Sequence, residues 1–225
     1  MYAVTLSWDD GFRDSTAKIA RIYEKFGFRA DFNIVATYHL SGQNHTASIF
    51  GDFGWWNELR ARGHFIHPHG LDHSNKAHLP LAAAQEKIRT CLEIFGRELK
   101  FFDPAQAVFA FPYNDSTPEV EAWLAGQVRA FRTNGPGIQT FPTAGTRRIT
   151  TTGREDAEAC LDECLDKLFA LPEGWLVYTA HGLDGEGWGP LRSDYLERLL
   201  ARLQEHEDVR VLPTLDVLER RHPLL

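Results

Sequence analysis

The stretch from Tyr2 to Gly11 reads YAVTLSWDDG, a run of β-branched, aromatic and aliphatic residues that ends in two carboxylates and a glycine. The composition of the run predicts a strand, and the glycine permits a sharp turn directly after it. Adjacent residues that leave a strand point to opposite sides, so Asp9 and Asp10 can take different tasks, one toward a metal and one toward water or substrate. The alternative is a polar turn in which an aspartate caps the next helix.

The rest of the chain repeats this order of strand, loop and helix. Between the predicted strands lie stretches whose apolar residues recur at helical spacing. About seven such units without a break in composition predict an α/β fold, a barrel of parallel strands with outer helices that residues 1–225 form as a single domain. Besides the first, we expect strands at 30–36, 64–66, 108–111, 130–133, 175–179 and 209–212.

The composition is that of a globular chain and excludes several other classes. The 225 residues are 43% hydrophobic and include 3 cysteines, which argues against collagen-like, disordered and disulfide-stapled proteins. Lys and Arg number 24 against 31 Asp and Glu, a net charge of −7, and no basic cluster stands out. We therefore expect neither nucleic acid nor a membrane as partner. Since no leader precedes the first strand, we expect a cytoplasmic protein, of unknown oligomeric state.

Polar side chains follow the carboxyl ends of several predicted strands. A histidine-rich stretch follows the third strand, the sequence Pro-Tyr-Asn-Asp follows the fourth, and a His-Gly pair follows the strand at 175–179. In a parallel barrel all these ends lie on one face, which is where such folds assemble their sites. Residues far apart in the chain can therefore meet in one site.

His69 and His73 are the sharpest signal for a metal. We expect them on the first turn of a helix, where a spacing of four places both imidazoles on one face as ligands for Zn²⁺ or a similar ion. Asp9 or Asp10 is available to add a carboxylate, which leaves positions open for water and substrate. This ligand set suits Zn²⁺ best, with Co²⁺, Ni²⁺ and Mn²⁺ as alternatives.

The order and separation of these residues resemble the polysaccharide deacetylase family, the NodB-homology fold of carbohydrate esterase family 4. Leu6–Gly11 (LSWDDG) looks like its first motif, and Gly63–His73 (GHFIHPHGLDH) looks like its second. The resemblance extends over most of the chain. It implies a distorted (β/α)7 barrel with a divalent metal held by Asp10, His69 and His73.

The third motif departs from the family pattern. Its usual form is Arg-x-Pro-Tyr, but Ala110 stands at the arginine position here. The resemblance makes Asp9 the general base that this arginine orients, and Arg132, at the end of the next strand, is the candidate substitute. A surface ion pair is the alternative for Arg132. The backbone N–H of Tyr113 would donate to the oxyanion, and its ring would either contact substrate or pack in the core.

The segment from Trp175 to Gly182 resembles the fifth motif, an apolar strand that ends in histidine. The pKa range of His181 suits protonation of a leaving amine near neutral pH, so it is the predicted general acid. Leu176, with Val177, is predicted to wall the pocket for the acetyl methyl group. Trp188, in a glycine-rich loop, is predicted either to stack on a sugar or to close the barrel rim.

Together these features predict a metal-dependent hydrolase that removes an acetyl group, N-acetyl rather than O-acetyl, from a sugar or oligosaccharide. One alternative is a C–N hydrolase of the same fold that acts on a cyclic imide or another non-sugar amide. A non-catalytic carbohydrate-binding barrel is a second, suggested by the missing arginine. A structural metal site is a third, although four protein ligands normally close such a site. Specificity is expected from the loops at 38–54 and 183–190.

Overall fold

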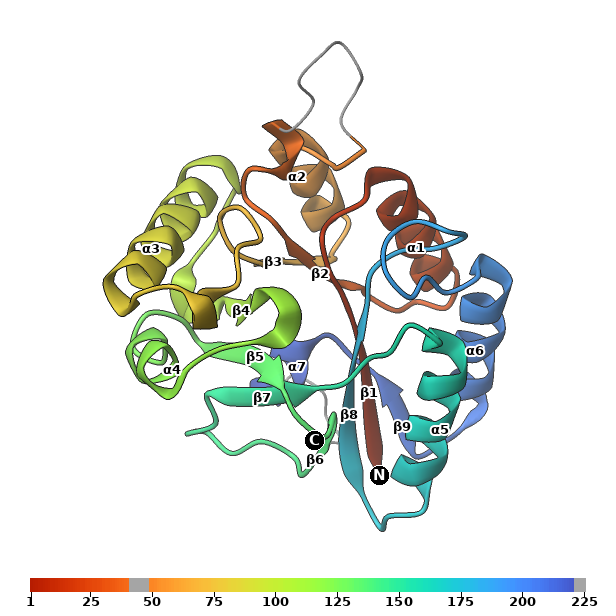
Figure 1. The fold of residues 1–225 in the computed structure, drawn as a ribbon. Coiled ribbons are helices and arrows are strands. Elements are labelled where there is room, and N and C mark those ends of the chain that lie inside the picture. Colours follow the sequence, from red (N-terminus) through yellow and green to blue (C-terminus); the bar gives the residue numbers. More distant parts are fainter. Residues whose placement is uncertain (41–48, 221–225) are drawn as a thin grey trace.

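The computed structural model describes residues 1–40 and 49–220 as parallel strands enclosed by helices (Figure 1). The strands are β1 (Tyr2–Trp8), β2 (Asp31–Ile34), β3 (Phe65–Pro68), β4 (Val108–Ala110), β5 (Ala130–Asn134), β6 (Ile138–Gln139), β7 (Arg148–Thr151), β8 (Gly174–Ala180) and β9 (Val209–Val211). The helices are α1 (Arg13–Lys25), α2 (Phe53–Ala61), α3 (Leu81–Glu98), α4 (Pro118–Leu124), α5 (Ala157–Phe169), α6 (Ser193–Glu205) and α7 (Thr214–Leu218).

Two sheets form the wall of the barrel. The larger has the order β3-β2-β1-β8-β6, with β9 paired to the first half of β1, and the smaller has the order β4-β5-β7. β6 runs antiparallel to β8, and the other strand pairs of both sheets are parallel. β7 meets β8 through one bridge, between Thr152 and Tyr178. The wall strands, β1 to β5 with β7 and β8, make a distorted (β/α)7 barrel, as expected. β7 was not among the predicted strands, whereas the predicted strand at 209–212 is β9, which pairs with β1 at the side of the larger sheet.

The seam between β3 and β4 is closed by side chains. No sheet pairing joins these two strands in the described part of the chain. Instead, the Val108 N–H donates to Nδ1 of His67 at 3.3 Å, and Nδ1 of His69 lies 2.9 Å from the carbonyl oxygen of Ala110. The imidazoles of His67 and His69 thus make the hydrogen bonds between β3 and β4 that backbone pairing would make in a continuous sheet.

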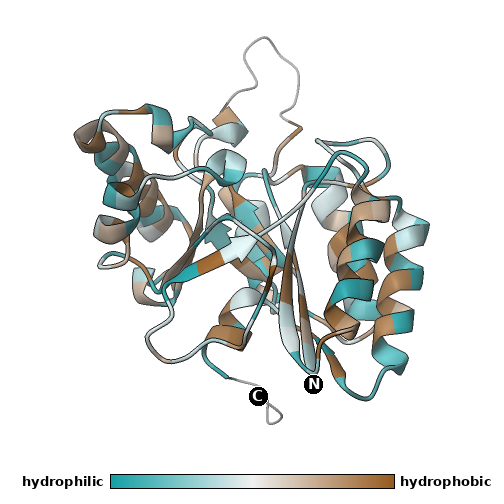
Figure 2. Cartoon of the chain, turned by 60° about the horizontal axis from the view of Figure 1, so that its bottom comes forward, coloured by the Kyte–Doolittle hydropathy of each residue, from teal (hydrophilic) through white to brown (hydrophobic). Residues whose placement is uncertain are grey.

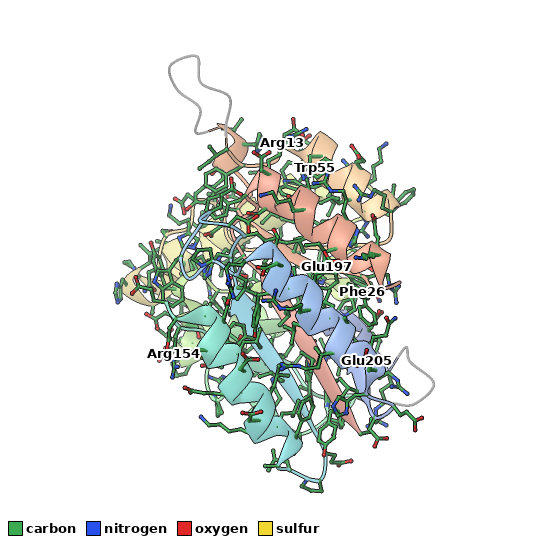
Figure 3. The ribbon with its side chains drawn as sticks, turned by 90° about the vertical axis from the view of Figure 1, so that its right-hand side faces the viewer. Arg13, Phe26, Trp55, Arg154, Glu197 and Glu205 are labelled. Carbon is green, nitrogen blue, oxygen red and sulfur yellow. The ribbon has the colours of Figure 1, made fainter. Side chains whose placement is uncertain are left out.

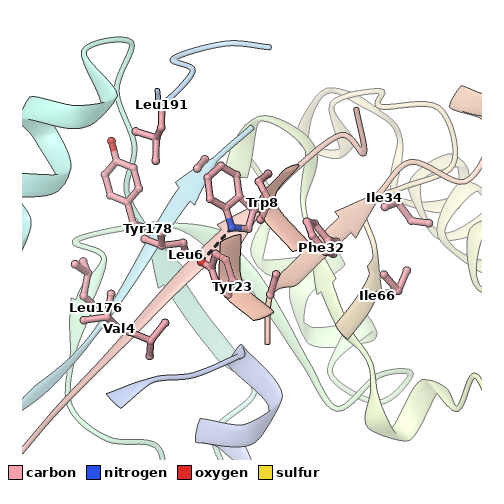
Figure 4. Close-up of a cluster of buried hydrophobic side chains, with 14 of the residues drawn as sticks. Val4, Leu6, Trp8, Tyr23, Phe32, Ile34, Ile66, Leu176, Tyr178 and Leu191 are labelled. Atoms are coloured by element: carbon pink, nitrogen blue, oxygen red, sulfur yellow. Dashed lines mark hydrogen bonds between the residues drawn. The ribbon is translucent and has the colours of Figure 1, made fainter. Parts of the chain in front are cut away.

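The strands divide the core into an outer and an inner layer, because successive side chains point to opposite faces. In β8, Leu176 and Tyr178 pack with Val4 of β1 in the cluster beneath the helices (Figure 4). Trp175 and Val177 belong to the cluster inside the barrel. Leu176 therefore does not face the barrel interior. This position disagrees with the prediction that Leu176 walls an acetyl pocket.

Helix α7 closes the amino-terminal end of the barrel. Its Val217 and Leu218 pack in the inner cluster. Thr214 donates through its backbone N–H, at 2.9 Å, and through its hydroxyl to the buried carboxylate of Asp31. With this end filled, the barrel is open at the carboxyl ends of its strands, on the face where the polar loops lie.

The helices turn one apolar side inward and one polar side to solvent, and both kinds of residue alternate along them in Figure 2. In α6, the buried residues recur at the predicted helical spacing. Glu197 and Glu205 lie on its outer side (Figure 3). Between α1 and α2, the Arg13 guanidinium stands 5.0 Å from the centre of the Trp55 ring. Among the described residues, no helix is both long and apolar enough to cross a bilayer.

The position of Leu176 yields a stability prediction. Leu176 is 0% exposed, so Leu176→Ala should lower the free energy of unfolding by about 2–5 kcal/mol through lost burial and an unfilled cavity. Leu171→Ala is the matched control, because Leu171 is 43% exposed and its loss should cost about 0.5 kcal/mol or less. Urea denaturation measures both values, and equal stability of the two variants would contradict this placement of Leu176.

Candidate functional site

A cavity of about 570 Å³ opens at the carboxyl ends of the barrel strands. Its wall comes from the loops that follow β1, β3, β4, β5, β7 and β8. Arg132 lies buried behind this wall, and Leu176 lies outside it. The sequence-predicted residues that do line the cavity are Asp9, Asp10, His69, His73, Tyr113, His181 and Trp188.

Asp10, His69 and His73 bring their potential ligand atoms together. Oδ1 of Asp10 lies 3.3 Å from Nε2 of His73 and 3.8 Å from Nε2 of His69, and one such atom from each of the three residues lies within 4.8 Å of the others. This Oδ1 is buried without a hydrogen-bond partner among the described residues. Burial, and then the neighbouring Asp9 charge, raise the pKa of Asp10 to about 7. A divalent cation would satisfy the orphaned oxygen, so the residues fit a metal.

The backbone of β4 fixes the orientation of His69. The Ala110 carbonyl, 2.9 Å from Nδ1 of His69, can only accept a hydrogen bond, so Nδ1 carries the proton. Nε2 is then left with its lone pair toward Asp10. Burial lowers the pKa of His69 to about 3 and also lowers the pKa of His73. Both imidazoles are therefore neutral at pH 7, which is the form that binds metals.

The loop that carries His73 is not the helix predicted from the histidine spacing. Residues 69–75 contain no helix, and α3 begins only at Leu81. Gly70 and His73 have φ angles of 91° and 56°, which a right-handed helix does not allow. The predicted helical turn was wrong. A left-handed backbone at His73, an uncommon conformation for histidine, brings its ring centroid within 5.0 Å of that of His69.

A buried lysine braces this loop. Lys76 is 0% exposed, and its Nζ donates to the carbonyl of Ser74 at 2.6 Å and to the hydroxyl of Ser74 at 3.0 Å. Burial lowers the pKa of Lys76 to about 8. Because a buried ammonium needs acceptors, these bonds hold the residue next to His73 in place.

A cage of hydrogen bonds holds Asp9 beside the metal ligands. Arg132 donates from Nη1 to Oδ1 of Asp9 at 2.9 Å and from Nη2 to Oδ2 at 2.5 Å. Nδ2 of Asn33 also donates to Oδ1, at 2.9 Å, and the Ser7 hydroxyl oxygen accepts from Arg132 and from Asn33 at 2.8 Å each. Burial pushes the pKa of Asp9 upward, but the charge and hydrogen bonds of Arg132, together with the neighbouring His69 and His181, more than offset it, and the pKa falls to about 2. Asp9 is thus an anion at neutral pH.

Arg132 enters this cage from the strand next to Ala110. The two residues are direct partners in the parallel pairing of β4 and β5. The side chains of Arg132 and Asp9 are 1% and 3% exposed, so their contact is a buried pair and not the surface ion pair held as the alternative. The guanidinium that the third motif lacks at position 110 is therefore supplied from the neighbouring strand.

Ser7 and Asn33 are site residues that the sequence reasoning missed. Both lie in strands interpreted as apolar, and both are buried, at 1% and 2% exposure. A signal was present at Asn33, because asparagine is depleted from strands and a buried amide requires hydrogen-bond partners. That signal indicates a polar contact without naming its partner.

Tyr113 and Trp188 present aromatic surface at the cavity mouth. The Tyr113 residue is 65% exposed, and its ring centroid lies 4.7 Å from that of His73, so the ring is not packed in the core. Trp188 is 50% exposed and stands edge-on to the His181 ring, with centroids 5.5 Å apart.

His181 lies at the end of β8, on the wall that also carries Thr179. Its Nδ1 is buried without a hydrogen-bond partner in the described part of the chain. Burial lowers the pKa of His181, and the negative charge of Asp9 opposes that shift. The imidazole is therefore neutral at rest, and the Asp9 carboxylate favours its protonation while the Arg132 guanidinium opposes it.

Several solved structures share this fold, which is that of the polysaccharide deacetylase-type barrels. The chain aligns with the Bc1960 peptidoglycan N-acetylglucosamine deacetylase at a TM-score of 0.67 and 15% identity, over 97% of this chain and 92% of that one. It aligns with a family 4 acetyl xylan esterase from Clostridium thermocellum, in complex with a cobalt ion, at a TM-score of 0.64 and 15% identity, over 97% and 91%.

A third similar structure is Puue allantoinase, with a TM-score of 0.72 and 13% identity over 98% of this chain and 90% of that one. No family model matches the chain, and no curated protein matches it. At these identities the likeness establishes the barrel fold, and activity has to be argued from the site.

The cage around Asp9 yields a second stability prediction. Arg132→Met should lower the free energy of unfolding by about 3–5 kcal/mol, because it leaves a buried carboxylate without its counter-charge. Arg148→Met is the matched control: Arg148 is half exposed, pairs with Glu121, and should contribute less than about 1 kcal/mol.

A double variant separates the pair from general damage. If the two side chains act together, Asp9→Asn with Arg132→Met should cost less than the sum of the two single changes in urea denaturation. Strictly additive losses would rule out the coupled cage.

Proposed function

We propose that the protein is a metal-dependent hydrolase that removes an acetyl group, N-acetyl in the first place, from a sugar or oligosaccharide. The observation that carries the proposal is the convergence, in one cavity, of a cation-binding triad, a carboxylate held as an anion and a histidine on the far wall. Two of the structures with this fold are a peptidoglycan N-acetylglucosamine deacetylase and an acetyl xylan esterase, which supports this class of substrate.

Asp10, His69 and His73 would hold the cation. Zn²⁺ suits the set best, with Co²⁺, Ni²⁺ and Mn²⁺ as alternatives, and the esterase of the same fold holds cobalt. A cation bound there supplies Lewis-acid polarisation of the acetyl carbonyl and acidifies water. The protein's own part is to keep both imidazoles neutral and to keep the ligand atoms within reach of one ion.

Asp9 would serve as the general base. Its Oδ2 accepts from Arg132 and lies 3.6 Å from Nε2 of His69, so it adjoins the metal ligands without being one. A carboxylate with a pKa of about 2 is fully ionised at neutral pH, but it holds a proton only briefly. We infer that Asp9 takes a proton from the attacking water and releases it again at once, so that it does not remain protonated.

His181 would be the general acid that protonates the departing nitrogen. Because it is neutral at rest, it has to gain a proton during the reaction, and the Asp9 charge favours that gain. The products are then acetate and a free amine. The backbone N–H of Tyr113 would donate to the oxyanion, and its exposed ring, with that of Trp188, offers a flat apolar surface to a sugar.

Of the two loops expected to give specificity, 183–190 carries Trp188 at the cavity. The loop at 38–54 falls partly outside the described residues, at 41–48. The case for a non-catalytic barrel rested on the missing arginine, and Arg132 removes that basis. Hydrolysis of a cyclic imide or another non-sugar amide stays as the second candidate, because an allantoinase shares this fold.

Metal binding can be tested without any substrate. After dialysis against Zn²⁺ and removal of excess, elemental analysis should find about one equivalent in the wild type and little in His73→Ala, since three protein ligands define the site. His78→Ala is the control, because His78 is a nearby histidine whose side chain is 77% exposed. Retention of the ion by His73→Ala would exclude this ligand set.

Acetate release tests the reaction. The wild type should release acetate from N-acetylglucosamine oligomers, a chelator should abolish the release, and Asp9→Asn should reduce it by about 10²–10⁴-fold, the usual share of a general base. The metal content of Asp9→Asn, measured in parallel, shows whether the loss is catalytic.

Undiminished acetate release by Asp9→Asn or by His69→Ala would contradict the proposed metal-dependent deacetylase activity. Turnover of a cyclic imide such as dihydrouracil, with no acetate released from any sugar, would favour the second candidate instead.

A further inference from the structure

We propose that the side-chain amide of Asn114 is a specificity-determining group that hydrogen-bonds the substrate next to the reacting acetyl group. The inference rests on the proposed function and names a residue that the reaction chemistry above does not use. Asn114 lines the cavity directly after Tyr113. Three observations carry the argument: its backbone conformation, the fixing of its main chain and the state of its amide.

Tyr113 and Asn114 form two consecutive left-handed residues, with φ angles of 61° and 52°. This conformation is unfavourable for residues other than glycine, although asparagine tolerates it better than most. Glycine would adopt it without strain. If the backbone alone mattered at position 114, glycine would serve at least as well, so the presence of an amide there calls for a second reason.

The main chain of Asn114 is firmly held. Its N–H donates to the Phe111 carbonyl at 2.9 Å, and its own carbonyl accepts from the Thr133 hydroxyl at 3.0 Å. Thr133 lies in β5 and is 2% exposed. The main chain that carries the Asn114 side chain is therefore anchored to the barrel wall.

The oxygen of the Asn114 amide lacks a hydrogen-bond partner within the part of the chain that the structure describes. This atom, Oδ1, is itself buried. A buried polar group left in this state is destabilising, and such groups in native structures call for an explanation. Asn114 is a partly exposed residue of the cavity wall, so a rotation of its amide would bring this oxygen to a ligand that supplies the missing bond.

The chemistry of the amide defines what it reads. A carboxamide both donates and accepts, so an exchange of its oxygen and nitrogen leaves the conclusion intact. Beside the acetyl-binding position, a substrate offers two such groups, the acetamido N–H and a sugar hydroxyl. A simple acetate ester of a phenol offers neither, which makes it the diagnostic comparison.

The experiment uses Asn114→Gly, which removes the amide and keeps a residue suited to the left-handed backbone. Acetate release is measured for the metal-loaded wild type and variant on N,N′-diacetylchitobiose, acetanilide and 4-nitrophenyl acetate. We expect kcat/KM to fall at least ~10-fold on the sugar, the effect of about 1.4 kcal/mol, and to change less than ~2-fold on the ester.

The acetanilide arm identifies the group that Asn114 binds. A matching loss on acetanilide assigns the acetamido N–H, and an unchanged rate on acetanilide assigns a sugar hydroxyl; both outcomes support the proposal. Asn114→Asp keeps an acceptor and loses the donors, so it tells which half of the amide is used. Phe101→Gly is the control for the backbone change, because Phe101 also has a positive φ, 58°, and lies outside this cavity.

Two outcomes would overturn the proposal: an equal loss on all three substrates, which indicates general damage to the site, or no loss on the sugar. A wild type that releases acetate from none of the three substrates would instead refute the proposed function, and this inference with it. The wild-type measurement therefore separates the two failures.

Discussion

The pairing of Arg132 with Asp9 is the contact on which the rest of the site depends. It joins β5 of the smaller sheet to the end of β1 in the larger one, and Asn33 of β2 and Ser7 of β1 complete it. A buried ion pair needs bonds to its remaining polar atoms, and the two neutral residues supply part of them, whereas Nε of Arg132 is buried without a hydrogen-bond partner among the described residues. The same contact helps to hold Asp9 as an anion, while burial and then the Asp9 charge raise the pKa of the adjacent Asp10 against the opposing charge of Arg132.

Much of the fold could be predicted because the alternation of strand and helix is periodic and local. The convergence of Asp9, Asp10 and His69 on one face followed from parallel topology alone. The conformation of the His73 loop could not be predicted in this way, because a left-handed histidine depends on tertiary contacts and leaves no periodic trace. The orientation of Leu176 failed for a different reason: in a strand buried on both faces, apolar residues do not reveal which side is inward.

Arg132 illustrates how a guanidinium beside a carboxylate can come from a strand other than the one that carries the sequence motif. What Asp9 needs is a guanidinium in a particular volume, and residues 110 and 132 are register partners on neighbouring strands that border that volume. A small alanine at one position leaves room for the long side chain from the other. The sequence motif lacks an arginine at position 110, but in three dimensions Arg132 still places a guanidinium beside Asp9.

His69 has a structural position as well as a place in the candidate metal site, because its imidazole helps to close the seam between β3 and β4. One ring nitrogen of His69 ties the larger sheet to the Ala110 carbonyl of the smaller sheet, and the other faces Asp10. An ion held by that second nitrogen and by Asp10 would connect the loop after β1 to the seam between β3 and β4, which has no backbone pairing in the described part of the chain. Binding of such an ion and closure of this seam would then favour each other.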